Sequence, residues 1–254
     1  MKKKLVCIFL IVARLLGNDF DQSGFLNSDS DSITDSLFAI SGTGEDDIKA
    51  PWLAAIGKYS SENNHDELKV SCSGTILTRR YILTAAHCFT EQSNFKEKDF
   101  PNAVRVGSNR IDSRKSQDRR IEQYKKHPKY EYPIYYFDLA LVFLEEDLVF
   151  SSKISAISLP HTTMTHPGAG ASMSIQGWGK DEEGSFGKRV SVANVGIRSK
   201  AECDYKLSNA GSFQNIVDIL MPQLSEDILF CADASINTQG GTCRGDSGGP
   251  AVQK

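Results

Sequence analysis

The sequence predicts an all-β protein, an antiparallel barrel or sandwich, on three observations. The chain has 254 residues, of which 40% are apolar and 24% charged, values typical of a soluble globular protein that buries a full core. After Pro51, short apolar runs are separated by turn residues at fairly regular spacing, as in antiparallel barrels and sandwiches. Only Ser199–Leu207 has the spacing of a helix.

Nine short apolar runs are predicted to be strands because turn residues bound each of them. In chain order they are Trp52–Tyr59, Leu68–Leu77, Tyr81–Thr84, Ala103–Gly107, Arg120–Lys125, Leu139–Leu144, Met173–Gly177, Arg189–Arg198 and Leu229–Ala232. In the eighth run, Val190 and Val192 alternate with period two, and so do Val195 and Ile197. The slip between the two pairs predicts a β-bulge.

Residues 1–17 are predicted to be a secretory signal peptide. Lys2–Lys4 form a basic cluster, Leu5–Ala13 is apolar but shorter than the ~20 residues that a bilayer requires, and Gly17 is a small residue. The alternative is a cytosolic amphipathic N-terminus. We expect a secreted, extracellular protein with no membrane association after removal of the signal.

Residues 18–39 are predicted to be an acidic, flexible propeptide or linker that precedes a domain over residues 40–254. No Lys or Arg occurs from Asn18 to Asp47, and the five aspartates of residues 18–39 lie among Ser and Gly. Such a stretch cannot bury enough apolar surface to offset its ordering entropy.

The overall charge and the cysteines exclude several classes of function. With 29 Lys and Arg against 32 Asp and Glu, the net charge is −3, so no attraction for nucleic acid or anionic lipid is expected. Cys7 would leave with the signal peptide, and the five remaining cysteines imply a free thiol, an intermolecular bridge or a missing partner. No Cys-x-x-Cys pair occurs, and we expect no metal and no cofactor.

A run of basic residues stands out in the first half of the domain. Its members are Arg110, Arg114, Lys115, Arg119, Arg120, Lys125 and Lys126. The simpler interpretation is a solvated loop and strand edge, and the alternative is a docking surface for acidic partners.

Three separate segments carry residues suited to nucleophilic catalysis. They are Leu83–Cys88, which contains a His, Asp138–Leu141, which begins with an Asp, and Gly245–Pro250, which contains a Ser. A serine hydroxyl becomes a good nucleophile when an imidazole takes its proton, and a carboxylate on the other ring nitrogen fixes the tautomer. Glycines beside the Ser let backbone N–H groups face a substrate carbonyl.

On these motifs, the chain resembles the trypsin/chymotrypsin-like serine proteases. Thr-Ala-Ala-His-Cys, Asp-Leu-Ala-Leu and Gly-Asp-Ser-Gly-Gly-Pro occur in that order, supported by Cys72–Thr75 and Gly177–Gly179. The resemblance runs from about Ile40 to the end of the chain. It implies two perpendicular, antiparallel six-stranded β-barrels with an active site in the crevice between them.

The resemblance also implies roles for single residues. His87 would be the general base and acid, Asp138 would orient it, and Ser247 would be the nucleophile, with the N–H groups of Gly245 and Ser247 as the oxyanion hole. It further implies two disulfides, Cys72–Cys88 and Cys203–Cys231.

Activation and specificity follow from the same resemblance. A cut before Ile40 would free an ammonium group that pairs with Asp246, although Ala39 is not the basic residue that a trypsin-like activator needs. Gly241 would lie at the base of the specificity pocket, which implies a preference for uncharged side chains. The chain ends seven residues after Ser247, so the second barrel is expected to be incomplete at the C-terminus.

We therefore expect a secreted serine endopeptidase that works through a His–Asp–Ser triad and an acyl-enzyme. Its partners would be protein or peptide substrates and protein inhibitors, and the chain would be a monomer. A non-catalytic protease homologue that serves as a binding or regulatory scaffold, or an inactive fragment, remains the alternative. A thiol-dependent or metal-dependent hydrolase has no supporting residues.

Overall fold

The computed structural model describes most of the chain after residue 47. The described residues are 48, 50–59, 68–92, 95–132, 137–159, 167–180, 188–199, 201, 202, 205, 231–234, 242 and 244–253. The expected signal peptide and propeptide, together with Ile40, Cys203, Gly241 and Cys243, lie outside them. No helix within the described residues is long and apolar enough to cross a membrane.

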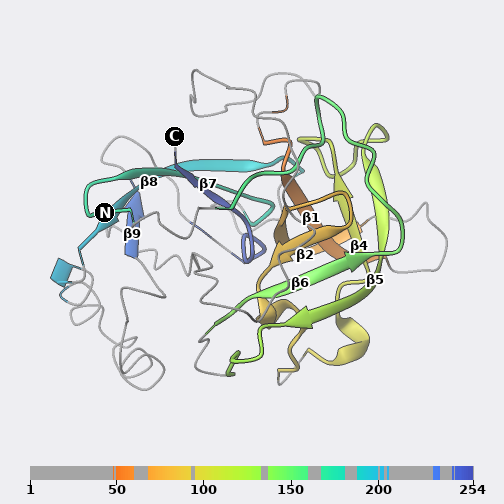
Figure 1. Cartoon of the computed structure of the whole chain (residues 1–254), viewed down its shortest axis with the longest axis horizontal. Helices are drawn as coiled ribbons and strands as arrows, with labels where there is room; N and C mark the ends of the chain where they lie inside the picture. Colours follow the sequence, from red (N-terminus) through yellow and green to blue (C-terminus); the bar gives the residue numbers. More distant parts are fainter. Residues whose placement is uncertain are drawn as a thin grey trace.

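Six strands close into an antiparallel barrel in the order β1-β2-β3-β6-β5-β4, coloured orange to green in Figure 1. They are β1 (Leu53–Tyr59), β2 (Leu68–Ile76), β3 (Tyr81–Thr84), β4 (Ala103–Val106), β5 (Gln117–Lys126) and β6 (Ala140–Leu144). The register shifts between Ile56 and Gly57 on β1 and between Ile121 and Gln123 on β5. Such bulges increase the bending that closure of a barrel requires.

Alternating side chains of these strands fill the barrel. On β6, Ala140, Val142 and Leu144 are buried while the residues between them are partly exposed, the period-two pattern of a half-buried strand. A short 3₁₀ helix, Ala86–Phe89, seals one end with Phe89, which is fully buried and stacks on Tyr124 with 4.2 Å between ring centroids.

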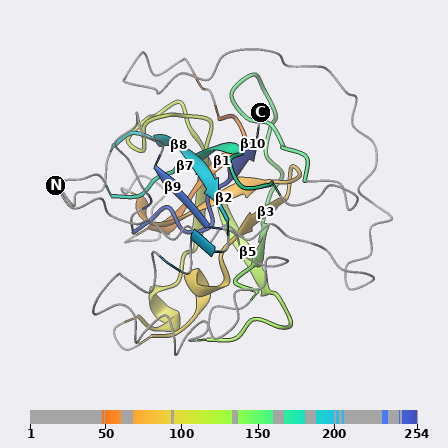
Figure 2. The ribbon, with the colours of Figure 1, turned by 90° about the vertical axis from the view of Figure 1, so that its left-hand side faces the viewer.

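A second, four-stranded antiparallel sheet has the order β10-β7-β8-β9. Its strands are β7 (Ser172–Gly177), β8 (Ser191–Arg198), β9 (Cys231–Ala234) and β10 (Ala251–Gln253). A small cluster that includes Met173, Ile175, Val195 and Ile197 is buried beside it. In Figure 2 the teal and blue strands of this sheet lie in front of the barrel.

The predicted strands are confirmed with end shifts of a few residues, and one local prediction is wrong. Strand β8 pairs with β7 from Ser191 to Gly196 without a register shift, so the expected bulge between Val192 and Val195 does not form. The two valines are three residues apart, so they face opposite sides of a regular strand. Accordingly, Val195 is buried and Val192 is only partly buried. Strand β10 was not predicted, since three residues are too short to show a period.

Two contacts join the second sheet to the barrel near the expected site. The indole N–H of Trp52 donates a hydrogen bond of 2.9 Å to the side-chain carbonyl of Gln176 on β7. Trp178, directly after β7, is 3% exposed and belongs to the same buried cluster as Leu53 and Ala55 of β1. These contacts fix the end of β7 against the barrel.

Candidate active site

His87 and Asp138 meet at one end of the barrel through two hydrogen bonds. The Nδ1 atom of His87 lies 2.6 Å from Oδ2 of Asp138, and the backbone N–H of His87 donates to Oδ1 at 2.8 Å. The Asp138 side chain is 4% exposed and that of His87 is 25% exposed. A buried carboxylate on Nδ1 fixes the imidazole ring and makes Nε2 the nitrogen that can take up a proton.

Strand register explains why the two residues meet. Thr84, the last residue of β3, pairs with Ala140, the first residue of β6. His87 lies three residues after the end of β3, and Asp138 lies two residues before the start of β6. Both therefore lie at the same end of this strand pair. The turn before Asp138 is tight: Phe137 has a φ of 49°, and its carbonyl accepts the N–H of Leu139 at 2.6 Å.

A disulfide holds the helix of His87 against the barrel. Cys72 on β2 is bonded to Cys88. The sulfur atoms of Cys72 and Cys88 and an imidazole nitrogen of His87 lie within 4.8 Å of one another, but disulfide sulfurs offer no thiolate to a metal. The cluster therefore constrains His87 rather than forming a zinc site.

The 244–249 loop brings Ser247 to the same end of the barrel. The carbonyl of Ser247 accepts the backbone N–H of Ser73 at 2.8 Å. Gly248 has a φ of +81°, and a Cβ there would lie 2.7 Å from the backbone nitrogen of Ala85, two residues before His87. The close approach of these backbones requires glycine at this position.

The residues before Ser247 are held by the turn after β7. The N–H of Lys180 donates to the carbonyl of Arg244 at 2.9 Å, and Gly245 adopts a φ of 106°. The carboxylate of Asp246 accepts the N–H of Gly179 at 2.7 Å and lies where side chains on Gly177 and Gly179 would be. Both glycines are therefore needed to make room for this carboxylate.

Ser73 has a position in the site that sequence reasoning missed. It is fully buried, and its hydroxyl donates to the carbonyl of Gly245 and accepts the N–H of Trp178, both at 2.9 Å. Ser73 was visible only as part of the Cys72–Thr75 motif. Its partners lie 172 and 105 residues away, so no local pattern could assign them.

Three other predicted site residues have no described position, so their places in the site stay predictions. Ile40, Gly241 and Cys203 lie outside the described part of the structure. Cys231, on β9, is disulfide-bonded and buried. Its expected pairing with Cys203 thus stays a prediction.

Comparisons with known proteins place the chain among proteases. The Trypsin family model matches residues 39–254. The chain is 31% identical over 215 residues to trypsin delta of Drosophila erecta, covering 84% of this chain and 73% of the relative. It is also 31% identical over 212 residues to serine proteinase stubble of Drosophila melanogaster, covering 80% of this chain and 24% of that protein.

Solved structures agree with the sequence relatives. Neuropsin, a serine protease expressed in the limbic system of mouse brain, matches with a TM-score of 0.60 at 26% identity. The match covers 83% of this chain and 81% of the neuropsin chain. Human heparin binding protein shares the fold, with a TM-score of 0.59 at 21% identity. The match covers 81% of this chain and 76% of the heparin binding protein chain. The chain belongs to the trypsin-like serine protease family.

Proposed function

We propose that the chain is a secreted serine endopeptidase that cleaves peptide bonds through an acyl-enzyme, with His87, Asp138 and Ser247 as its triad. The observation that carries this proposal is the hydrogen bond of 2.6 Å between His87 Nδ1 and the buried Asp138 carboxylate. A structural surface histidine does not need a buried carboxylate bound to both its ring and its backbone N–H.

The proposed reaction has two steps. His87 Nε2 takes the proton of Ser247 Oγ as this oxygen attacks the substrate carbonyl carbon, and Asp138 stabilises the imidazolium. The tetrahedral intermediate expels the amine product, which receives the proton from His87. A water molecule then attacks the acyl-enzyme with His87 again as base, and its proton returns to Ser247 Oγ as the carboxylic acid leaves.

Gly245 and Ser247 would supply the N–H groups that bind the oxyanion. The carbonyl of Arg244 is held by Lys180, and in a trans peptide the N–H of the following residue points the opposite way. The direction of the Gly245 N–H is thereby set before substrate arrives. In sites of this class, one such donor stabilises the transition state by about 3 kcal/mol.

Activation would begin with a cut before Ile40 by a protease that accepts small apolar residues. The new ammonium group would pair with Asp246, whose carboxylate already lies against Gly177 and Gly179. N-terminal sequencing of secreted protein tests this step, and a mature terminus other than Ile40 would contradict it.

Specificity would favour uncharged side chains, because Gly241 offers no carboxylate to an Arg or Lys substrate. The comparison to make is between ester substrates with Phe or Leu and those with Arg. Faster cleavage of the Arg ester would be the opposite of the expected order.

The decisive experiment is covalent labelling with a fluorophosphonate, which reacts with activated serines. We expect the secreted chain, once cut before Ile40, to be labelled once, at Ser247, and the Ser247→Ala variant to remain unlabelled. His87→Ala should slow the labelling by orders of magnitude while leaving the fold intact by circular dichroism. A folded chain that has been cut before Ile40 and is still not labelled at Ser247 would instead be a non-catalytic homologue.

A further inference from the structure

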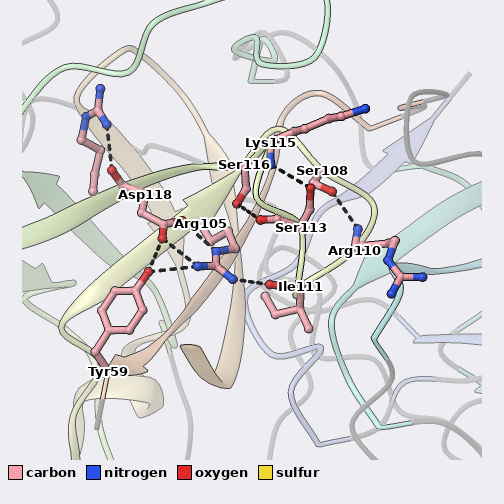
Figure 3. Close-up of polar contacts among 10 residues, drawn as sticks. Tyr59, Arg105, Ser108, Arg110, Ile111, Ser113, Lys115, Ser116 and Asp118 are labelled. Carbon is pink, nitrogen blue, oxygen red and sulfur yellow. Dashed lines mark hydrogen bonds and ion pairs between the residues drawn. The ribbon is translucent and has the colours of Figure 1, made fainter. Parts of the chain in front are cut away.

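The loop between β4 and β5 is braced from the inside (Figure 3). The guanidinium of Arg105 donates two hydrogen bonds of 2.7 Å to the carboxylate of Asp118, and a third to the backbone carbonyl of Ile111 in the middle of the loop. The hydroxyl of Tyr59 donates to the same carboxylate. Paired, charge-assisted bonds of this kind fix geometry, so the loop surface is held in one shape.

Short-range hydrogen bonds order the turns that carry the basic residues of this loop. The hydroxyl of Ser108 accepts the N–H of Arg110, and that of Ser113 accepts the N–H of Lys115, both at 3.0 Å. Figure 3 shows the side chains of Arg110 and Lys115 pointing away from the Arg105 cluster. The loop therefore displays its cations outward.

The fold brings a second basic segment beside this loop. The N–H of Ile111 donates to the carbonyl of Lys188 at 2.9 Å, and Arg110 faces Arg189 in an isolated antiparallel bridge. The resulting basic surface consists of Arg110, Arg114, Lys115, Lys188 and Arg189. Like charges opposite each other in a β-bridge are unfavourable unless a counter-charge is supplied.

Little negative charge is present on the same segments. Residues 109–115 and 188–190 contain five cations and one carboxylate, Asp112, a net charge of +4. Asp112 lies 2.8 Å from Arg110 and 3.6 Å from Lys188, and its hydrogen bond with Arg110 lowers its pKa. Arg114 and Arg189 are exposed and form no ion pair with another residue that the structure describes.

Three of the four other cations of the basic run have partners within the barrel. Arg119 donates to the carbonyl of Asp147 at 3.0 Å, Arg120 lies over the ring of Tyr59, and Lys126 donates to the carbonyl of Phe89. These side chains are structural, which separates them from the basic surface.

We propose that the basic surface docks the acidic segment of this same chain, residues 18–47. That segment contains eight carboxylates and no Lys or Arg, a charge of −8. Ala50, two residues after the first described residue Ile48, is buried in the same cluster as Ile111 and Val190 of the two basic segments. Since Asp47 is three residues from Ala50, it lies within about 11 Å of that anchor.

The docking is electrostatic and intramolecular, and this determines how it responds to salt. The covalent link gives the segment an effective concentration in the millimolar range, so weak pairs suffice. Exposed charges are screened over about 10 Å at 0.1 M salt, so the segment should detach as ionic strength rises. This inference does not depend on catalysis.

Zero-length carbodiimide cross-linking of the full chain, mapped by mass spectrometry, tests the contact directly. In 20 mM NaCl, Lys115 and Lys188 should couple to carboxylates of residues 18–47, with a yield independent of protein concentration. In 500 mM NaCl the yield should fall at least fivefold. Cross-links that rise with protein concentration would mean contact between copies and would overturn the proposal.

Variants that leave both coupling lysines in place give the sharper result. Arg114→Glu with Arg189→Glu should lower the cross-linking yield severalfold. The matched pair Lys98→Glu, at an exposed site of the 97–99 turn, with Lys125→Glu, at an exposed site of β5, should leave the yield unchanged. Adding Glu45→Lys, Asp46→Lys and Asp47→Lys to the first pair should restore coupling between the segment and positions 114 and 189.

Two results would contradict the proposal. One is coupling of Lys115 and Lys188 to Asp181–Glu183 alone, because those carboxylates would then be the counter-charge. The other is an unchanged yield in the Arg114→Glu, Arg189→Glu variant while circular dichroism shows a folded protein.

Discussion

The hydroxyl of Ser73 donates a hydrogen bond of 2.9 Å to the carbonyl of Gly245, which joins residues 172 positions apart. The same oxygen accepts the N–H of Trp178, and the backbone N–H of Ser73 binds the carbonyl of Ser247. One buried residue of β2 thus holds both the turn after β7 and the 244–249 loop. If Gly245 and Ser247 bind the oxyanion, Ser73 is a positioning residue for that site.

Replacing Ser73 by alanine should loosen this loop. The Ser73→Ala variant leaves the Trp178 N–H and the Gly245 carbonyl without a partner in a buried place, which costs about 1–3 kcal/mol. We expect kcat of the activated enzyme to fall about tenfold or more with little change in KM, measured on a peptide ester. Ser71→Ala on the same strand is the matched control, because within the described residues the Ser71 hydroxyl makes a single long contact, 3.5 Å to the carbonyl of Ile56. Equal effects of the two substitutions would refute a positioning role.

Exchanging Asp138 for asparagine should leave the fold intact and remove the fixed tautomer of His87. An amide that donates to Nδ1 places the proton on Nε2, where it cannot accept one from Ser247. We expect the fluorophosphonate labelling rate to fall on the order of 10⁴-fold, as in sites of this class. The exposed Asp147 offers the control, since Asp147→Asn should label at the normal rate. An Asp138→Asn variant that retains most of the labelling rate would show that Asp138 is not part of the triad.

Alanine at Gly248 should be more costly than alanine at Gly170, although both glycines have a positive φ. At Gly170, with a φ of +89° and nothing within 4 Å of the new Cβ, only backbone strain of about 1 kcal/mol is expected. At Gly248 the Cβ also collides with the backbone of β2 and of Ala85. Urea unfolding should therefore show the larger loss of free energy for Gly248→Ala. Similar losses at both sites would mean that the loop moves away easily.

The stability that Tyr59 provides should disappear in alkali. Burial, followed by the hydrogen bond to Asp118, raises the pKa of Tyr59 to about 12. An unfolded tyrosine ionises near pH 10, so between pH 10 and 12 the unfolded chain releases this proton first. The free energy of unfolding of the native protein should therefore exceed that of Tyr59→Phe by its full amount below pH 10. This difference should disappear as the pH rises toward 12.

Urea unfolding at pH 8, 9.5 and 11 measures this advantage as a difference between the two proteins. Tyr132→Phe, at an exposed tyrosine, is the matched control for general effects of alkali. A difference between native protein and Tyr59→Phe that stays constant from pH 8 to 11 would contradict the assigned pKa.

The parts of the fold that could be predicted are those encoded by neighbours in sequence. Alternation of apolar residues identifies β6 and most other strands, since each strand buries one face. The barrel order follows from pairings that no local pattern states, such as Thr84 with Ala140. The bulge that was wrongly predicted in β8 shows the limit of this approach. Valines that move from one face of a regular strand to the other give the same sequence pattern as a shift in register.

The site divides in the same way. His87, Asp138 and Ser247 stand in motifs, and the hydrogen bonds of His87 with Asp138 join two of these motifs in space. Ser73, and the bridge between Arg110 and Arg189, could not be predicted because their partners are distant in the chain. Gly177 and Gly179 were seen in a motif, but only the position of the Asp246 carboxylate explains why they have no side chain.

The pairing order of the first barrel has a consequence for synthesis on the ribosome. All six of its strands lie between Leu53 and Leu144, so the barrel can close before β7 has been translated. The 244–249 loop, in contrast, is bound by Ser73 and by residues after β7, and its contacts with Ser73 span more than half the chain. Such long-range contacts form late. A nascent chain would therefore carry a finished barrel before Ser247 is organised, and the residues proposed for catalysis would come together only after residues 244–249 had been translated.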